Sequence, residues 1–457
     1  MDKKTIMENL ACESYEKGGF NGAWLYAENG EIVARGTTGF CDPENTTPIA
    51  EDTIFQLASV SKQFTASAVM LLVRKGAVSL EDEITKFFPE IPYPGVTVRH
   101  LLTHTSGIPD YFDDADWFID IWKQEKRVPG NDEILRFLCE TKAKAYFAPG
   151  EGLEYSNTGY NLLALLVERL SGIPYEEFLQ KNIFEPAGMT STRCCHIRRD
   201  GVPFRNYARA SVFENGRHVA DMDSANVSDV AAFDGLNGDD YVYTNIFDMF
   251  TWDRALREGR VLSREEQQLM YTPAKLSNGE EAVFDEDDGL GYGFGWGVGR
   301  DGELGLIVSH SGGMPGVITW FERFIDADRV LVMLSNRDPE DYRAFAGFYK
   351  GMQKIARAKE PEPIRTIEEI AVRNPDRSKW ESFCGRYEHP EDEEFIIDEV
   401  FMKDDGLYAN AVTEEYGEFT FRLYPIGDNE FGRKSGMLKL TFGDGCVRYG
   451  EFTCKKL

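Results

Sequence analysis

The segment from residue 59 to residue 76 constrains the fold most, because it reads as an apolar helix that has to be buried. Ser59 and Lys62 stand at its start, and Lys75-Gly76 ends it. Residues three apart share one helix face, so this hydroxyl and this amine can come within hydrogen-bond distance. If Ser59 lies in the first turn, its backbone N–H is also an unpaired donor at the positive helix end. The segment predicts a buried helix whose start combines a nucleophile, a base and a donor for developing negative charge.

The Ser-x-x-Lys spacing by itself is weak evidence, since roughly one copy arises by chance in a chain of this composition. A second copy, Ser14-Tyr-Glu-Lys17, lies in a polar helix predicted over residues 1–17, which offers no apolar face for packing into a cleft. We give that copy no weight and look for further elements around the first.

A Tyr-x-Asn element occurs three times, as Tyr155-Ser-Asn157, Tyr243-Thr-Asn245 and Tyr408-Ala-Asn410. Only the first follows a Pro/Gly turn and precedes an apolar helix, predicted over residues 158–170. The other two lie in strand-like runs, where an aromatic residue beside a turn Asn is ordinary. Tyr155 and Asn157 are therefore predicted on a loop at a rigid helix start.

A third element, His310-Ser-Gly312-Gly313, follows a strand-like run over residues 304–309. It is the only His-x-Gly in the chain. Glycines let backbone approach a ligand closely, and an N–H there would complete an oxyanion pair with that of Ser59. The alternative is that His310 is a hydrogen-bonded structural residue at a strand end.

These three elements, in this order, resemble the class C β-lactamases and penicillin-binding-protein-like serine hydrolases, a family that also holds esterases, D-stereospecific aminopeptidases and DD-peptidases. The resemblance covers residues 15–350 and includes the segments 98–110, 291–296 and 310–316. His104, within the first of these segments, is expected to be a structural group.

The resemblance implies acyl transfer through a covalent intermediate on Ser59. Lys62 and Tyr155 would share removal of the Ser59 proton, and which of them is the base stays open. Tyr155 would return a proton to the leaving group. Asn157 would hold the substrate amide or the Lys62 amine.

The remaining site residues implied by the resemblance lie after the strand 304–309. The N–H groups of Ser59 and Gly313 would bind the oxyanion next to Gly312, and His310 would orient the substrate or tune Tyr155. Penicillin-degrading relatives carry Lys or Arg where this chain has His310, so we expect an esterase, amidase or peptidase. The alternatives are a class C-type β-lactamase or penicillin-binding protein, and a catalytically silent binding or sensing module. No metal or cofactor is predicted.

Composition restricts partners and location. The net charge of −28 disfavours nucleic acid, and no apolar run is long enough to span a membrane. Eight cysteines show no Cys-x-x-Cys pair, which favours reduced thiols. We expect a cytoplasmic enzyme that acts on a small molecule or short peptide, although a removed export signal is an alternative. The oligomeric state stays open.

The strand pattern predicts an α+β fold. A hairpin turns at Asn29-Gly30, the stretch from residue 59 to about 250 is mostly helical, and strands are expected at 292–298, 304–309, 317–324 and 330–335. The resemblance implies an α/β sandwich of the β-lactamase/transpeptidase type, with helices flanking an antiparallel sheet and a large helical insertion. The active site would lie between sheet and insertion.

Two domains are predicted. Residues 1–358 would form the hydrolase domain, and residues 359–378 a linker that begins with the stiff, exposed Pro-rich stretch 359–363. Residues 379–457 show recurrent turns between short β runs, typical of a small all-β barrel or sandwich. This second domain carries no catalytic signature and is expected to play a supporting role.

Overall fold

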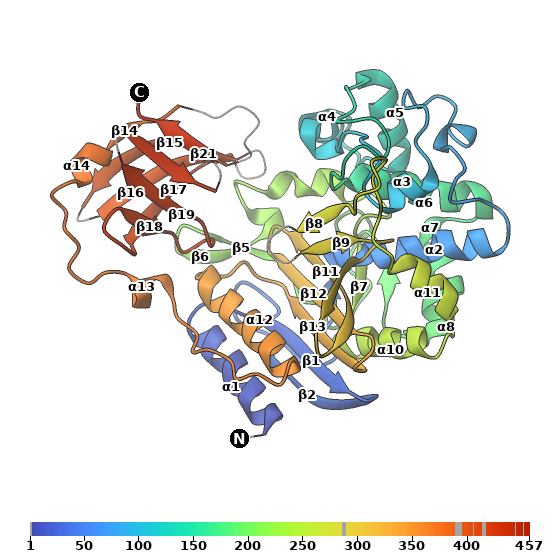
Figure 1. Ribbon diagram of the computed structural model, residues 1–457, viewed down its shortest axis with the longest axis horizontal. Coiled ribbons are helices and arrows are strands. Elements are labelled where there is room, and N and C mark those ends of the chain that lie inside the picture. The colour runs from blue at the N-terminus through green and yellow to red at the C-terminus, as the bar shows by residue number, and fades with distance from the viewer. Residues whose placement is uncertain are drawn as a thin grey trace.

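Two antiparallel sheets organise the molecule (Figure 1). The structure is a computed structural model that describes residues 2–285, 289–388, 395–404, 406–413, 417–443, 445–450 and 452–457. One sheet belongs to the part with the predicted active site, and the other forms the C-terminal part of the chain.

The first sheet joins strands from both ends of the hydrolase part in the order β2-β1-β13-β12-β11-β10-β9-β8. β1 pairs with β13 from Gly22↔Ser335 to Glu28↔Arg329, so the N-terminal hairpin completes a sheet made far downstream, as predicted. The strands are β1 (Gly22–Glu28), β2 (Glu31–Thr38), β8 (Val283–Asp285), β9 (Leu290–Tyr292), β10 (Gly297–Asp301), β11 (Gly305–Met314), β12 (Val317–Phe324) and β13 (Arg329–Ser335).

Two turns in this sheet show what local sequence does and does not reveal. Asn29 and Gly30 have φ angles of 50° and 78°, the positive pair that the predicted hairpin turn requires. The strand expected over 292–298 is interrupted, because a turn separates β9 from β10. Gly295 in that turn has a φ of 75°, and a Cβ there would lie 2.9 Å from the Lys62 carbonyl oxygen. The interruption thus lets the turn pack against the start of the helix that carries Lys62.

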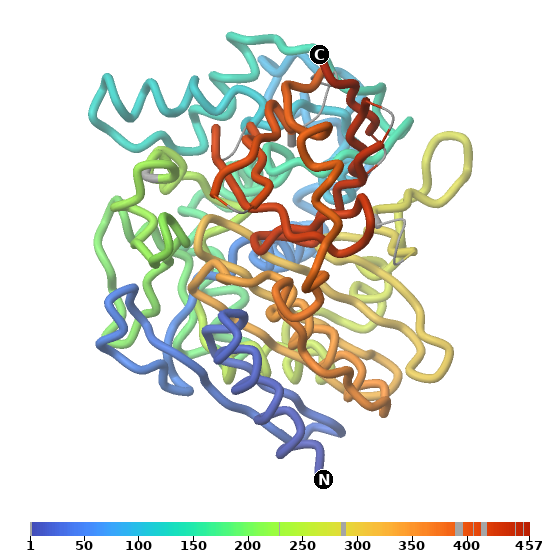
Figure 2. The backbone as a smooth tube through the Cα atoms, turned by 90° about the vertical axis from the view of Figure 1, so that its left-hand side faces the viewer, coloured from blue at the N-terminus to red at the C-terminus, as the bar shows by residue number. Residues whose placement is uncertain are grey.

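One face of the sheet is covered by α1 (Lys3–Glu16) and α12 (Tyr342–Ala356), which lie side by side (Figure 2). α1 buries Met7 and Leu10 against this core, so the N-terminal helix does have an apolar side. The prediction of a helix without one was wrong, because a few well-spaced apolar residues suffice to dock a mostly polar helix.

The helical insertion packs on the other face of the sheet. Its central helix is α2 (Lys62–Arg74), buried over nearly its whole length, with Phe64 against Phe184 and Trp252. The other helices of this part are α3 (Val98–Leu102), α4 (Ala115–Asp120), α5 (Asn131–Thr141), α6 (Asn157–Ser171), α7 (Tyr175–Leu179), α8 (Glu185–Ala187), α9 (Ile197–Asp200), α10 (Ile246–Arg257) and α11 (Arg264–Met270).

Two small sheets complete this part. One is a three-stranded sheet in the order β3-β7-β4, formed by β3 (Phe55–Gln56), β7 (Val242–Thr244) and β4 (Arg193–Cys194). A separate hairpin consists of β5 (Ser211–Glu214) and β6 (Arg217–Ala220). In the part of the chain that the structure describes, no helix combines the length and apolar character needed to cross a membrane.

The C-terminal sheet runs in sequence order and closes on itself. Leu457 N–H donates to the Arg386 carbonyl and Glu388 N–H to that of Lys455, both at 2.8 Å, which joins its first strand to its last. A barrel, one of the two predicted forms, is therefore present, with its own apolar core. It consists of α14 (Trp380–Phe383), β14 (Gly385–Arg386), β15 (Phe395–Lys403), β16 (Gly406–Thr413), β17 (Gly417–Pro425), β18 (Glu430–Gly432), β19 (Lys439–Gly443), β20 (Cys446–Tyr449) and β21 (Phe452–Lys455).

The segment between the two parts, residues 359–378, is exposed at first and then docked. Ile364 is buried in the core under α1 and α12, and the short helix α13 (Ile367–Ile370) follows. Ile367 N–H donates to an Asp341 carboxylate oxygen at 2.9 Å, and Val372 N–H donates to the Pro425 carbonyl at 2.7 Å. From Ile364 to Val372 the predicted linker thus contacts both parts of the molecule.

Candidate active site

Ser59 lies in a single 3₁₀ turn, Ala58–Ser61, that leads directly into α2 at Lys62. Side chains three residues apart eclipse each other in a 3₁₀ turn, and the Lys62 Nζ donates to the Ser59 Oγ at 3.0 Å. Ser59 was expected in the first α-helical turn, and this tighter turn brings the two side chains together more directly. Ala58 has a φ of 49°, an unusual left-handed conformation for a residue with a side chain, directly before the candidate nucleophile.

The Lys62 amine is fully buried and has three oxygen partners. Besides Ser59, it donates to the Asn157 Oδ1 at 2.7 Å and to the Asp239 carbonyl at 3.1 Å. The last two oxygens can only accept hydrogen bonds. They hold two of the amine hydrogens and direct the third toward the Ser59 oxygen.

Tyr155 and Asn157 come to this site on the loop before α6 and on its first residue. Ser156 caps the helix by accepting from the Gly159 N–H at 3.3 Å, which explains why the polar pair sits at a rigid start. The Tyr155 ring centroid lies 4.8 Å from the Lys62 Nζ. Burial raises the pKa of the Tyr155 hydroxyl, and the Lys62 charge opposes that rise. This buried hydroxyl has no hydrogen-bond partner among the described residues.

His104 supports this loop from behind. Its ring lies 4.2 Å from that of Tyr155, and its Nδ1 accepts from the Ser156 N–H at 3.1 Å. Burial lowers the pKa of His104 well below its usual value, so the ring is neutral. These contacts are those of a structural histidine that positions the Tyr155 loop.

His310 is buried on β11, contacts Tyr292 and lies 6.2 Å from the Tyr155 ring, measured between ring centroids. Its Nδ1 lies 2.5 Å from the Ser311 carbonyl and its Nε2 lies 2.8 Å from the Tyr292 hydroxyl. Because the carbonyl can only accept, Nδ1 carries the proton and Nε2 accepts from Tyr292. Burial, reinforced by the Lys62 charge, lowers the pKa of His310 to about 3. The ring is neutral, with both nitrogens engaged inside the protein.

Gly312 and Gly313 lie where β11 passes the turn that carries Ser59. A Cβ on Gly312 would be 2.2 Å from the Leu57 carbonyl oxygen and 3.0 Å from the Ala58 Cβ, so only glycine fits. A Cβ on Gly313 would meet nothing within 4 Å. β10 pairs with β11 only as far as Ser309, so within the described residues no strand covers that edge of Gly313. Backbone here is open to a ligand beside Ser59.

Three buried carboxyl groups near Lys62 were not predicted. Burial raises the pKa of Asp110 to about 6, and burial together with the Asp239 charge raises that of Asp240 to about 7. The Asp239 carboxylate accepts from Asn161 at 2.6 Å and from the Tyr111 hydroxyl at 3.1 Å. The available signal was Gly238-Asp239-Asp240 before a predicted strand, but the backbone carbonyl that Lys62 uses leaves no trace in sequence.

The other Tyr-x-Asn and Ser-x-x-Lys copies have structural roles. Asn245 caps α10 by accepting from the Asp248 N–H at 2.9 Å, and Asn410 accepts from the Thr420 hydroxyl at 2.6 Å within the barrel. Ser14 is buried and donates to the Ala344 carbonyl at 2.9 Å, while Lys17 pairs with Glu369 at 3.0 Å. Among the residues that the structure describes, no group of three or more His, Cys, Asp or Glu side chains could hold a metal ion.

Comparison with known proteins agrees with this geometry. A family model described as Beta-lactamase matches residues 7–350. Penicillin-binding protein 4* of Bacillus subtilis (strain 168) is 38% identical over 448 residues, which cover 96% of this chain and 92% of that protein. The chain belongs to the beta-lactamase family. The predicted family and the prediction of a β-lactamase-related serine hydrolase are confirmed.

Two further relatives show how widely this family likeness extends. Esterase EstB of Burkholderia gladioli is 34% identical over 183 residues, 36% of this chain and 44% of the esterase. The structure of the octameric penicillin-binding protein homologue from Pyrococcus abyssi has a TM-score of 0.67 at 23% identity and covers 100% of both chains. This second likeness confirms the predicted fold, including the all-β C-terminal domain.

Proposed function

We propose that this protein hydrolyses an ester or amide bond through a covalent acyl intermediate on Ser59, with Lys62 as the primary base. The observation that carries this proposal is the set of contacts of the Lys62 amine. In its charged form the amine donates to Ser59, whereas the neutral form that acts as the base has two hydrogens and one lone pair. With Asn157 and the Asp239 carbonyl accepting the two hydrogens, the lone pair points at the Ser59 hydroxyl.

In the first step the Ser59 oxygen bonds to the substrate carbonyl carbon while its proton moves to the Lys62 amine. The carbonyl becomes an oxyanion, which the N–H groups of Ser59 and Gly313 stabilise. The openness of the strand edge at Gly313 supports this assignment. The tetrahedral intermediate then collapses and the leaving group departs.

Tyr155 is assigned to the proton that the leaving group needs. Its hydroxyl has no other hydrogen-bond partner in the described part of the chain, and its raised pKa keeps it protonated at neutral pH. It donates to the departing nitrogen or oxygen and recovers a proton from Lys62. In the second step water attacks the acyl ester, with the same groups activating it, and Ser59 is regenerated.

The substrate class proposed is a small-molecule ester, amide or short peptide without a carboxylate that must be bound at residue 310. His310 is neutral and internally bonded, so it offers no cation for such a group. We assign it to positioning β11. The name of the esterase relative favours ester hydrolysis. The name of the Bacillus relative favours a second candidate, penicillin binding with slow acylation by β-lactams.

The proposal extends to the organisation of the whole chain. Residues 1–358 act as the hydrolase domain, 359–378 connect, and 379–457 form the supporting β domain, whose separate core favours such a division. All eight cysteines are free thiols, which is compatible with a reducing, cytoplasmic location.

The test compares wild type with Ser59→Ala on a p-nitrophenyl acyl ester, a D-alanyl peptide, a D-amino-acid amide and a chromogenic cephalosporin. Ser67→Ala is the matched control, because Ser67 is a buried serine on α2, the helix that follows the Ser59 turn, and its hydroxyl donates to the Gln63 carbonyl. We expect turnover in wild type and control and its loss in Ser59→Ala. The preferred substrate then separates esterase, peptidase and β-lactamase.

A reactive serine probe followed by mass spectrometry distinguishes a silent module. Equal rates in wild type and Ser59→Ala, or no turnover together with no mass gain at Ser59, would refute the proposed function. Mass gain at Ser59 without turnover would instead support penicillin binding as the principal activity.

A further inference from the structure

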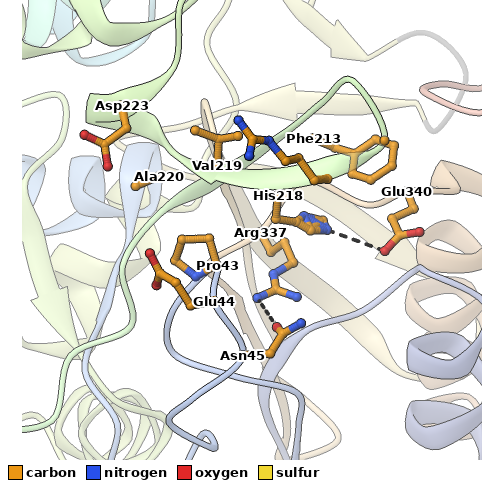
Figure 3. A pocket seen from close by; sticks show the side chains of 12 residues that line it. Pro43, Glu44, Asn45, Phe213, His218, Val219, Ala220, Asp223, Arg337 and Glu340 are labelled. Atoms are coloured by element: carbon orange, nitrogen blue, oxygen red, sulfur yellow. Dashed lines mark hydrogen bonds and ion pairs between the residues drawn. The ribbon is translucent and has the colours of Figure 1, made fainter.

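A cavity of about 520 Å³ lies between the β5–β6 hairpin, the loop after β2 and the segment after β13 (Figure 3). Its volume is within the range of small-molecule sites. None of the residues that line it hydrogen-bonds to Ser59, Lys62 or Tyr155 within the described structure. It is therefore a second site, apart from the proposed catalytic groups.

Arg337 is the buried cation of this cavity and is only 7% exposed. Its Nη2 donates to the Asp42 carbonyl at 2.8 Å and to the Asn45 Oδ1 at 2.9 Å, as Figure 3 shows for Asn45. Its Nε is buried without a partner, and its Nη1 makes no hydrogen bond to a described residue. No carboxylate in the described part of the chain forms an ion pair with it. A buried guanidinium in this state is poorly compensated, and because its Nε is enclosed by protein, Nη1 is the nitrogen left to donate to an oxyanion.

Glu340 is an uncompensated anion on the same cavity wall. Its carboxylate oxygen lies 3.7 Å from the Nε2 of His218, toward which it points in Figure 3. Burial and the Arg337 charge lower the pKa of His218 to about 4, so the imidazole is neutral and does not balance Glu340 at neutral pH. The Glu340 side chain is 54% exposed and remains accessible to a cation. The cavity thus holds a positive and a negative group whose charges interact but which form no direct ion pair in the described structure.

The surrounding residues restrict which ligand suits this arrangement. Glu44 and Asp223 add carboxylates to the lining and Arg217 adds a second guanidinium. With Arg337 and Glu340 the lining is therefore net negative, which disfavours a multiply charged anion such as phosphate. Phe213 and Val219 of the hairpin supply apolar surface beside the charged groups. A ligand that carries a carboxylate, an ammonium group and a small apolar part matches all three features.

We propose that this cavity binds a free amino acid, with its carboxylate on Arg337 and its ammonium group on Glu340. The guanidinium provides the planar donor geometry that a carboxylate matches. The α-carbon holds the two charges of the ligand a short distance apart, as the unpaired Arg337 and Glu340 require. This binding does not depend on acyl transfer at Ser59.

The experiment is isothermal titration calorimetry on the full chain, as wild type and as Ser59→Ala, with glycine, L-alanine and D-alanine. Sodium acetate and methylamine each carry one of the two charged groups, and inorganic phosphate tests for a simple anion site. At least one amino acid is expected to saturate the protein with an affinity about tenfold or more above acetate and methylamine. Ser59→Ala is expected to bind equally well, which separates this result from any failure of the proposed catalysis.

Two variants locate the site. Arg337→Gln and Glu340→Gln should each weaken amino-acid binding by about tenfold or more. Arg343→Gln is the matched control, because Arg343 also has an unpartnered Nε but does not line the cavity. If loss of the Arg337 contacts to the loop 42–45 prevents folding, the half-exposed Glu340 still decides the question.

Three results would overturn the proposal. One is the absence of saturation by every amino acid at millimolar concentration. Another is binding of phosphate or acetate as tight as that of amino acids, which would show a simple anion site. The third is loss of binding after Ser59 has been blocked by a covalent serine probe, which would place the ligand in the catalytic cleft.

Discussion

At the scale of single residues, Tyr155 offers the sharpest test of the proposed proton transfers. We predict that Tyr155→Phe lowers kcat for an amide substrate by about 100-fold or more, since the departing nitrogen must be protonated. A p-nitrophenyl ester should be affected much less, because p-nitrophenolate leaves without a proton. Steady-state kinetics on both substrates gives the ratio, and equal losses on both would assign Tyr155 to activation of Ser59 instead.

The buried Asp240 carboxyl leads to a prediction about how stability depends on pH. Its pKa is raised in the folded state to about 7, whereas a hydrated Asp titrates near 3.8, so the unfolded state binds fewer protons between these values. The free energy of unfolding therefore falls as the pH rises through this window. The Asp240→Asn variant lacks this titration. Its free energy of unfolding, relative to that of wild type, should therefore increase by about 2 kcal/mol between pH 5 and pH 8.

Urea unfolding of wild type and Asp240→Asn at the two pH values measures this difference. The lowered pKa of His310 acts in the opposite direction, with stability lost as the pH falls below about 6.5, but both proteins share it and it cancels. Asp116→Asn, which changes an exposed carboxylate, is the control. A difference between wild type and Asp240→Asn that does not vary with pH would contradict the prediction.

Sequence reasoning reached the side chains of this site and its proposed N–H donors but not the carbonyl that completes the Lys62 contacts. Ser59 with Lys62 and Tyr155 with Asn157 could be predicted because each pair is set by local spacing at a helix start. The Asp239 carbonyl, which completes the Lys62 contacts, belongs to a loop far along the chain. Every residue carries such a carbonyl, so no residue type signals this role.

At the scale of elements, the crossing of β11 and the 3₁₀ turn fixes the positions of the proposed oxyanion donors. Gly312→Ala would force a Cβ to within 2.2 Å of the Leu57 carbonyl, so β11 and the turn have to separate. We predict destabilisation by about 1–3 kcal/mol and a large loss of kcat. Gly313→Ala is the matched control for stability alone, because nothing lies within 4 Å of the added methyl group.

Thermal melting and ester hydrolysis of the two glycine variants decide this point. Unchanged melting and unchanged kcat in Gly312→Ala would show that β11 and the turn adjust freely.

Pairing with a neighbouring strand explains why the strand prediction at 304–309 was too short. β11 continues to Met314 because it pairs with β12 from Ile307↔Phe324 to Met314↔Val317. That pairing is set by the neighbouring strand.

At the scale of the whole molecule, the separate apolar cores of the hydrolase part and the barrel predict separate unfolding. Leu440 is fully buried in the barrel core and Leu163 is fully buried in the insertion. Leu440→Ala should lower the free energy of unfolding of the barrel by about 2–5 kcal/mol, while ester hydrolysis at 25 °C is retained. Leu163→Ala should lower the transition at which hydrolysis is lost.

Differential scanning calorimetry combined with residual activity after heating follows both transitions. A single transition lowered by either variant would show that the docked segment at Ile364 and Val372 couples the two parts into one cooperative unit. The exposed Pro-rich stretch predicted only a spacer there. The docking was not foreseen, because isolated apolar residues in a polar segment do not reveal which surface they meet.

The sequence by itself determined the features whose causes are local. The Asn29-Gly30 turn, the capped helix after Asn157 and the Ser59-Lys62 spacing each follow from conformational preferences over a few neighbouring residues. The family and the serine-hydrolase chemistry followed from the order of such local elements. Only the tertiary structure decided which distant groups meet. The Asp239 carbonyl at Lys62, Gly312 against Leu57 and the unpaired Arg337 beside Glu340 depend on strand order and loop packing, where each contact joins residues far apart in the chain.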